Sequence, residues 1–79
     1  SFDLYPNPTS TNSQVSFLVT EGETYNVSVY GMDGKLIQTE QLKSFSGTYM
    51  LPELASGAYS VALEQNGSKV VTRKWVVAK

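Results

Sequence analysis

Apolar and polar residues alternate in short runs along most of this chain, and this alternation constrains the fold more than any other feature. In residues 15–20, valine and phenylalanine at the odd positions lie on one side of an extended strand, and the intervening side chains lie on the other. Residues 25–30 and 59–64 repeat the pattern. A period of two is typical of half-buried strands and does not arise on one face of a helix. The chain is therefore expected to consist of short β-strands.

Turn-forming residues separate these runs, and two of the turns carry a hairpin signal. Asp33-Gly34 and Asn66-Gly67 predict tight hairpins, because these residue pairs adopt the positive φ angles that such turns need. The short polar segment Glu21-Gly22-Glu23 predicts a further hairpin between residues 15–20 and residues 25–30. The remaining strands are expected at residues 2–5, 36–42, 48–51 and 69–77.

Prolines mark where regular pairing ends. Pro6 and Pro8 follow the first expected strand, and Pro52 stops the strand at residues 48–51, because proline has no N–H to give to a ladder. Residues 9–13 are expected to form a polar loop. About seven short strands and no convincing helix predict an all-β fold, a single antiparallel β-sandwich that occupies residues 1–79 as one domain.

The composition excludes most catalytic, metal-binding and nucleic-acid-binding chemistries. The 79 residues include no His and no Cys, which removes imidazole bases, thiolate nucleophiles, disulfides and zinc sites built from these residues. Six Lys and Arg against seven Asp and Glu give a net charge of −1, without the basic patch that nucleic-acid binding needs. No apolar run reaches the roughly 18 residues of a membrane helix, so no direct membrane insertion is expected.

The carboxylates offer no convincing active site, and no cofactor or metal is expected. Glu21 and Glu23 lie two residues apart, as a pair for glycoside hydrolysis could, but a hairpin tip provides no burial to separate their pKa values. Asp33 is better explained by turn formation than by metal binding, because no further oxygen ligands follow at calcium-loop spacing. The chain is therefore not expected to be an enzyme.

Nine aromatic residues are many for so short a chain, and an exposed row of rings would suit sugar binding. Tyr25 and Tyr59 alternate in phase with apolar residues and are expected in the core, whereas Tyr30 is out of phase and is expected to be at least partly exposed. Both faces of the strand around Trp75 are nearly equally apolar, so the pattern leaves open which of them is buried. No row of three exposed rings in phase is visible, but an adhesive or carbohydrate-binding module is the alternative interpretation.

Four segments of the chain are individually weak signals but specific in combination, because of their order and spacing. They are Leu4-Tyr5-Pro6-Asn7-Pro8, then Val27-Ser28-Val29-Tyr30 running into Asp33-Gly34-Lys35, then Leu54-Ala55-Ser56-Gly57-Ala58-Tyr59-Ser60-Val61, and finally Lys74-Trp75-Val76-Val77-Ala78-Lys79. In this order they resemble the C-terminal sorting domains of the type IX secretion system of Bacteroidetes. The resemblance covers essentially all 79 residues and implies a seven-stranded immunoglobulin-like sandwich at the C-terminal end of a larger secreted precursor.

The resemblance also implies a function without chemistry of its own. Such a domain directs a cargo protein, fused at its N-terminal side, from the periplasm through the type IX outer-membrane translocon, with outer-membrane shuttle proteins as further partners. A surface cysteine protease of sortase type then removes the domain, and the cargo is anchored at the cell surface or released. The cargo, the cleavage site and the choice between anchoring and release stay open, as does weak homodimerisation through exposed strand edges.

The resemblance assigns roles to residues in each segment. Pro6, Asn7 and Pro8 mark the stiff lead-in to the domain, close to the processed linker. Asp33, Gly34 and Lys35 fix a hairpin, and Gly57 and Tyr59 fix the entry of a strand. Leu54, also part of the motif, lies in the connection Leu54-Ala55-Ser56-Gly57 before that strand. The last segment, whose integrity the export machinery requires, contains Lys74, Val76, Val77 and Lys79. A last strand at a sheet edge could be read by strand addition, although Trp75 is bulkier than the aliphatic residue expected beside Lys74.

Overall fold

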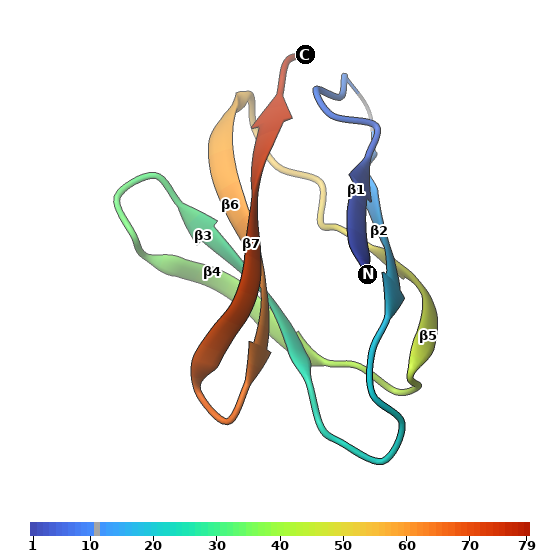
Figure 1. The fold of residues 1–79 in the computed structure, drawn as a ribbon. Helices are drawn as coiled ribbons and strands as arrows, with labels where there is room; N and C mark the ends of the chain where they lie inside the picture. The colour runs from blue at the N-terminus through green and yellow to red at the C-terminus, as the bar shows by residue number, and fades with distance from the viewer. Residues whose placement is uncertain (11) are drawn as a thin grey trace.

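The computed structural model describes residues 1–10 and 12–79, and in these residues it contains seven strands and no helix. The strands are β1 (Phe2–Tyr5), β2 (Gln14–Leu18), β3 (Asn26–Gly31), β4 (Leu36–Gln41), β5 (Ser46–Met50), β6 (Gly57–Gln65) and β7 (Ser68–Val77). They form two antiparallel sheets that pack face to face (Figure 1), so the predicted all-β antiparallel sandwich is confirmed. None of the described segments forms a helix that could cross a membrane. Thr11, in the polar loop predicted at residues 9–13, lies outside the described residues.

The three-stranded sheet has the order β1-β2-β5, and the four-stranded sheet has the order β4-β3-β6-β7. β2 and β3 therefore lie in different sheets, and the predicted hairpin between residues 15–20 and residues 25–30 is wrong. Both segments carry an apolar side, and these sides face each other across the core instead of lying next to each other in one sheet. The chain crosses between the sheets through residues 19–25.

Two hairpins form where the glycine-containing turns predict them. At the β6–β7 turn both central residues have positive φ, 53° at Asn66 and 80° at Gly67, as the tightest hairpin turns require. At the β3–β4 turn Gly34 has a φ of 85°, but Asp33 does not supply a second positive φ. Asp33 Oδ1 instead accepts a hydrogen bond from the Lys35 N–H at 3.0 Å, so this turn is wider than predicted.

β5 begins two residues before the strand predicted at residues 48–51, and Leu51 lies outside it. Gly47 pairs with Phe17 of β2, and a Cβ on Gly47 would lie 3.8 Å from the Phe17 ring. The Phe17 ring thus packs over a residue of low strand propensity, and the ladder extends further than propensity indicates. Leu51 is nevertheless buried, and its N–H donates to the Ser13 carbonyl at 3.0 Å.

The core lies between the sheets and is built largely from the alternating residues. β7 turns Trp75 and Val77 inward, at 1% and 3% exposure, and leaves Val70 exposed, which decides the facing that the pattern left open. Tyr25 is buried and Tyr59 is half-buried, whereas Tyr30 is half-buried on the opposite face of the sheet. The buried apolar cluster contains Phe2, Val15, Phe17, Tyr25, Val27, Val29, Leu51, Val61, Leu63, Trp75 and Val77.

The two lateral sides of the sandwich are closed in different ways. On the β4–β5 side, the Tyr49 hydroxyl accepts a hydrogen bond from Gln38 Nε2 at 2.7 Å and donates one to Glu40 Oε1 at 3.1 Å, which ties the two sheets together. On the β1–β7 side, residues 6–9, here called the lead-in segment, pair with the C-terminal half of β7. A pocket lined by Phe2, Val19 and Val71, among other residues, lies in the other half of this side.

Candidate functional site

Three of the segments that the sequence singles out meet at one end of the sandwich, at the top of Figure 1. The start of β6 pairs with the end of β7, with Gly57 opposite Val77. The lead-in segment lies along the other edge of β7. The turn at residues 33–35 lies at the same end of the four-stranded sheet, because Gly31 pairs with Tyr59, but β6 lies between this turn and β7.

The Asn7 side chain pairs with the edge of β7 as a backbone group would. Its Nδ2 donates a hydrogen bond to the Lys74 carbonyl at 2.7 Å, and its Oδ1 accepts one from the Val76 N–H at 2.9 Å. A side-chain amide carries a donor and an acceptor in the arrangement of a peptide group, so it can replace one. Pro6 and Pro8 have no N–H, and the side chain between them supplies the pairing that they cannot.

Thr9 continues this pairing with its own backbone. Its N–H donates to the Val76 carbonyl at 3.0 Å, and its carbonyl accepts from the Ala78 N–H at 2.7 Å, which forms a parallel bridge to Val77. Thr9 is 3% exposed, and its hydroxyl donates to the Asn12 carbonyl at 3.3 Å. The end of β7 is therefore hydrogen-bonded on both edges, by β6 and by the lead-in segment.

Trp75 anchors the end of β7 in the core and is tied to the lead-in segment through Ser13. The Trp75 Nε1–H donates to Ser13 Oγ at 2.9 Å, and Ser13 Oγ donates in turn to the Pro6 carbonyl at 2.7 Å. Both Ser13 and Trp75 are 1% exposed. A buried indole N–H needs an acceptor, so this relay buries a large ring beside the lead-in segment without leaving a donor unpaired.

The start of β6 is built around the Tyr59 ring. The Tyr59 hydroxyl donates to the Ala55 carbonyl at 2.6 Å, and its ring centre lies 5.5 Å from that of Trp75. A Cβ on Gly57 would lie 3.4 Å from the Tyr59 hydroxyl oxygen, so the backbone passes close to this ring. Leu54 is partly buried against the core. These contacts give the segment a structural role beside the end of β7.

The last segment mixes exposed and buried side chains. Lys74 and Lys79 are exposed, Val76 is half-buried, and Val77 is packed in the core. The Lys79 N–H donates to Ser56 Oγ at 3.0 Å, which ties the chain after β7 to the segment before β6. The two lysines are therefore accessible to a partner, whereas Val77 is not.

Sequence reasoning missed Thr9 and Ser13, which fall in a segment predicted as a polar loop. Both are nearly fully buried, but a buried polar residue leaves no periodic signal in a single sequence. The available signal is Trp75, because a buried indole requires an acceptor. That acceptor lies 62 residues away along the chain, and many hydroxyl groups could have served.

A second polar cluster lies on the outer face of the four-stranded sheet, around Glu64. Its Oε1 accepts a hydrogen bond from Ser28 Oγ at 2.6 Å, its Oε2 accepts one from the Tyr30 hydroxyl, and Lys69 Nζ lies 4.0 Å from Oε2. Burial raises the pKa of Glu64, but the two hydrogen bonds and the Lys69 charge together outweigh burial and hold it below its ordinary value of 4.5. Because Ser28 has a single hydroxyl proton, Thr39 donates to Ser28 at 2.9 Å. Glu64 is thus a paired structural carboxylate.

The carboxylates considered as catalytic or metal-binding candidates are dispersed. Glu21 and Glu23 are exposed in the crossing between the sheets, and Glu23 accepts a hydrogen bond from Gln65. Asp33 serves its own turn. In the part of the chain that the structure describes, no three carboxylates gather closely enough to hold a metal ion. What the site offers a partner is its shape and the charge of the exposed Lys74 and Lys79.

Comparison with known proteins bears on the whole of this arrangement. A family model described as the secretion system C-terminal sorting domain matches residues 3–78, which includes the lead-in segment, both hairpins and the last strand. None of the curated proteins matches the chain. The matched family is a family of sorting signals and not a catalytic family. The chain therefore belongs to the family of type IX secretion C-terminal sorting domains.

Proposed function

We propose that this domain is the C-terminal sorting signal of a larger secreted precursor. It directs a cargo, fused to its N-terminal side, from the periplasm through the type IX outer-membrane translocon, with outer-membrane shuttle proteins as further partners. A surface cysteine protease of sortase type then removes the domain, which leaves the cargo at the cell surface or in the medium. The family match over residues 3–78 supports the sorting role.

The observation that carries the proposal is the pairing of the lead-in segment with the end of β7. Asn7 and Thr9 together make four hydrogen bonds to backbone groups of residues 74–78. The lead-in segment and the last segment, to which this proposal assigns recognition during export, therefore lie side by side. A translocon component that contacts this end would meet both segments at once.

The same pairing restricts how the end of β7 can be read. Strand addition beside residues 74–78 would have to displace Asn7 and Thr9, because they already occupy that edge. We therefore assign recognition at this end to side chains, with exposed Lys74 and Lys79 as the contacts. Val77 supports them from within the core.

A carbohydrate-binding module would need a flat platform of exposed aromatic rings, and the described residues do not form one. Tyr5 and Phe45 are the most exposed aromatic side chains there, at 43% each. Tyr5 pairs with Gln14 at one end of the three-stranded sheet, whereas Phe45 precedes the Ser46 that pairs with Leu18 at the other end. Two rings at opposite ends of a sheet do not form one flat binding surface.

The proposal is tested by fusing the domain behind a periplasmic signal peptide and a folded fluorescent reporter, in a bacterium that has the type IX system. We expect the fusion to reach the surface or the medium and to be shortened there, whereas the reporter without the domain stays in the periplasm. Retention of both proteins in the periplasm, with the domain folded, would refute the sorting role and make glycan binding the next assay.

A further inference from the structure

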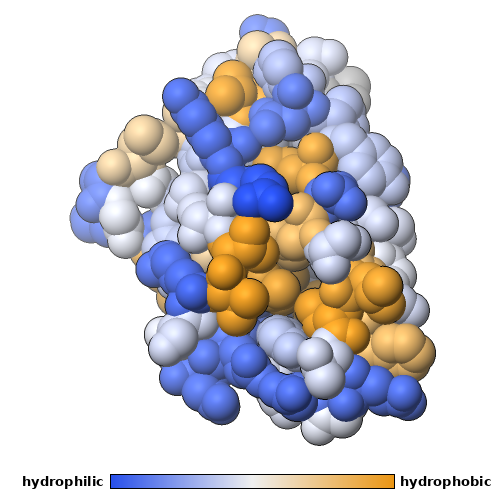
Figure 2. All heavy atoms as spheres, viewed as in Figure 1, coloured by the Kyte–Doolittle hydropathy of each residue, from blue (hydrophilic) through white to orange (hydrophobic). Residues whose placement is uncertain are grey.

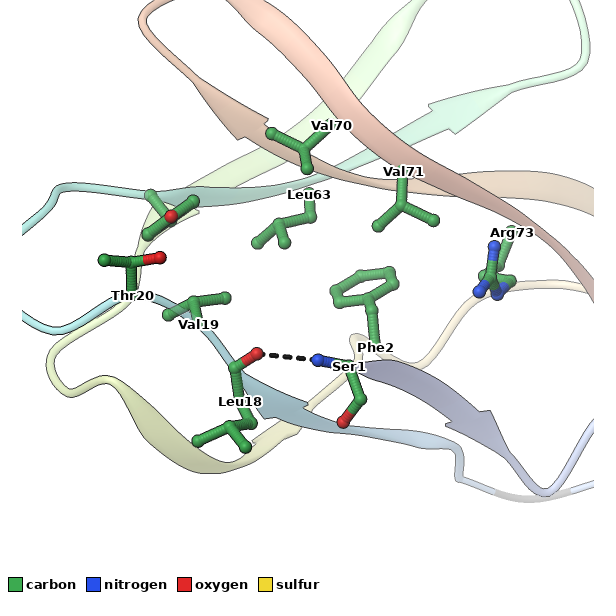
Figure 3. Close-up of a pocket in the computed structure, with 10 residues that line it drawn as sticks. Ser1, Phe2, Leu18, Val19, Thr20, Leu63, Val70, Val71 and Arg73 are labelled. Atoms are coloured by element: carbon green, nitrogen blue, oxygen red, sulfur yellow. Dashed lines mark hydrogen bonds between the residues drawn. The ribbon is translucent and has the colours of Figure 1, made fainter.

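A pocket of about 380 Å³ opens between the two sheets on the lower half of the β1–β7 side (Figure 3). Phe2, Leu63 and Val71 point into it from β1, β6 and β7. Phe2 and Leu63 belong to the core, whereas Val70 at the rim is 56% exposed. Figure 2 shows apolar surface gathered on both sides of this opening. The volume falls in the range of about 300–1,000 Å³ that is typical of binding pockets.

The β7 edge beside this pocket is a continuation of the edge that the lead-in segment covers. Residues 74 and 76 turn their backbone groups toward Asn7 and Thr9, away from β6. Because backbone groups alternate along an antiparallel strand, the N–H and carbonyl of Thr72 point to the same side. No strand follows β7 in the sheet, and in the described chain Thr72 receives there only a bond of 3.2 Å from Arg73 Nη1 to its carbonyl.

The opposite wall of the pocket presents a second unpaired edge. Ser1 and Leu18 exchange two backbone hydrogen bonds, of 2.7 and 3.0 Å, at the start of the β1–β2 ladder. The next residue, Phe2, therefore turns its backbone groups away from β2, and β1 is the last strand of its sheet. Among the described residues, the apolar pocket is thus flanked by two strand edges that no neighbouring strand pairs with.

Arg73 adds a charge to this opening. Its side chain lines the pocket and is exposed. Within residues 1–10 and 12–79, no carboxylate forms an ion pair with Arg73, and the one such pair present, Lys69–Glu64, lies on the outer face of the sheet. An incoming acidic group would therefore meet a guanidinium that has no ion pair and whose Nη1 donates only to the exposed Thr72 carbonyl.

We propose that this pocket docks an extended segment of a partner protein that adds as a strand to the free edge of β7 around Thr72. Apolar side chains at alternate positions of that segment fill the pocket above the buried Phe2 and Leu63 and contact the partly buried Val71, and a carboxylate on the same face pairs with Arg73. The upper half of the edge already takes the extended lead-in segment in this way, so the added strand continues an existing mode of pairing.

The charge argues for a foreign acidic segment over a second copy of this chain. Antiparallel pairing of two β7 edges centred on Thr72 would place the Arg73 side chains of both copies diagonally across one face of the new ladder, which like-charge repulsion opposes. Lys74 follows Arg73 in β7, but its side chain lies on the opposite face of the strand, and Lys79 lies beyond the end of the strand. The sorting role and the docking site can therefore fail independently.

The test is a titration of the ¹⁵N-labelled domain with a short peptide in which threonine alternates with valine and a final aspartate takes the place of one valine. We expect shifts of the amide signals of Phe2, Leu63 and residues 70–73. A matched peptide with lysine in place of aspartate tests the charge pair with Arg73. Two further peptides test backbone pairing: one is N-methylated at the odd-numbered amides, and the other at the even-numbered amides. We expect binding to be lost with methylation in one phase and weakened roughly tenfold with lysine.

Protein variants complete the test. Arg73→Glu should reverse the preference, so that the lysine peptide binds better than the aspartate peptide. Thr72→Pro removes an edge N–H that no strand uses and should weaken binding, whereas Thr72→Ala keeps that N–H and should not. Binding that ignores both charge and N-methylation would mean a general apolar pocket, and concentration-dependent dimerisation through residues 70–73 would mean a second copy. Either of these two results would overturn the proposal. Amide shifts confined to other residues, or no shifts at all, would overturn it as well.

Discussion

At the scale of single residues, the most informative side chain is Asn7, because its amide forms the hydrogen bonds that a backbone peptide group would form with β7. The prolines on both sides have no N–H, yet the edge of β7 needs a donor and an acceptor at this point. An asparagine amide supplies both, and aspartate would supply only the acceptor. The Pro6-Asn7-Pro8 sequence is thus explained by what lies beside it in the fold.

We predict that Asn7→Ala lowers the free energy of unfolding by about 1 kcal/mol, since two hydrogen bonds to β7 are lost at a solvent-exposed position. Asn7→Asp should be at least as destabilising, because a carboxylate would face the Lys74 carbonyl. Urea denaturation measures the change, and hydrogen exchange at the Val76 amide should become faster. Asn12→Ala, at an exposed position, is the matched control. An unchanged Val76 exchange rate in Asn7→Ala would contradict this account.

Ser13 is predicted to matter more for stability than its loop position implies. Ser13→Ala leaves the buried Trp75 N–H and the Pro6 carbonyl without their partner, which should cost about 1–3 kcal/mol. Denaturation followed by the fluorescence of Trp75, the single tryptophan of the chain, reports the loss directly. Ser10→Ala, at an exposed neighbouring position, should change little. Equal stability of the two variants would show that the relay through Ser13 is dispensable.

Glu64 predicts how stability depends on acid. Its pKa is lower in the folded chain than its ordinary value of 4.5, so its contribution is present above that value and is lost as the pH falls through the folded pKa. The urea midpoint should therefore fall on acidification from about pH 6 to about pH 3, and Glu64→Gln should reduce that fall. Glu53→Gln, at an exposed carboxylate, serves as the control. An identical pH profile for Glu64→Gln and the unaltered domain would rule out this role.

At the scale of elements, the C-terminal half of β7 alternates buried residues with more exposed ones. Val77 is 3% exposed in the core, whereas Val76 is half-buried on the outer face. We predict that Val77→Thr lowers stability by about 1–3 kcal/mol, because it buries a hydroxyl, and that Val76→Thr costs less than Val77→Thr. Thermal denaturation of the two variants measures the difference. The reverse order of stabilities would mean that the facing of β7 is misassigned.

Alternation along the sequence predicts most strands, but it does not determine how they are distributed between sheets. The crossing at residues 19–25 looks like a hairpin loop, because a polar segment with a glycine serves equally well within a sheet or between two. The facing of β7 is ambiguous in sequence, since valines occur on both sides, and burial of the large Trp75 ring decides it. The extension of β5 depends on Gly47 meeting the Phe17 ring, a contact across 30 residues of chain.

For the candidate site too, the sequence predicts the separate segments but not how they are arranged relative to one another. The segments themselves are visible in the sequence, although the turn at Asp33-Gly34 is wider than predicted and β6 begins at Gly57, two residues before the alternation at residues 59–64. Their mutual arrangement is not, because the bonds from Asn7 span 67 and 69 residues and involve backbone groups that no residue type reveals. Thr9 and Ser13 are missed for the same reason.

At the scale of the whole molecule, the sandwich has two distinct surfaces along one side. The upper half is sealed by the lead-in segment, and the lower half opens into the apolar pocket beside Arg73. One end therefore holds the segments shared with the sorting family, whereas the pocket carries features that this family match does not assign. The two surfaces can be altered separately.

The central claim is that the end where these segments meet carries the sorting signal. The most direct measurement compares export of the reporter fusion carrying the intact domain, Lys74→Glu or Lys43→Glu. Both lysines are exposed, so neither change should unfold the domain. Only Lys74 lies at the end where the segments meet, so Lys43→Glu is the control. We predict export of the intact and Lys43→Glu fusions and periplasmic retention of a folded Lys74→Glu fusion. Equal export of all three would contradict the assignment.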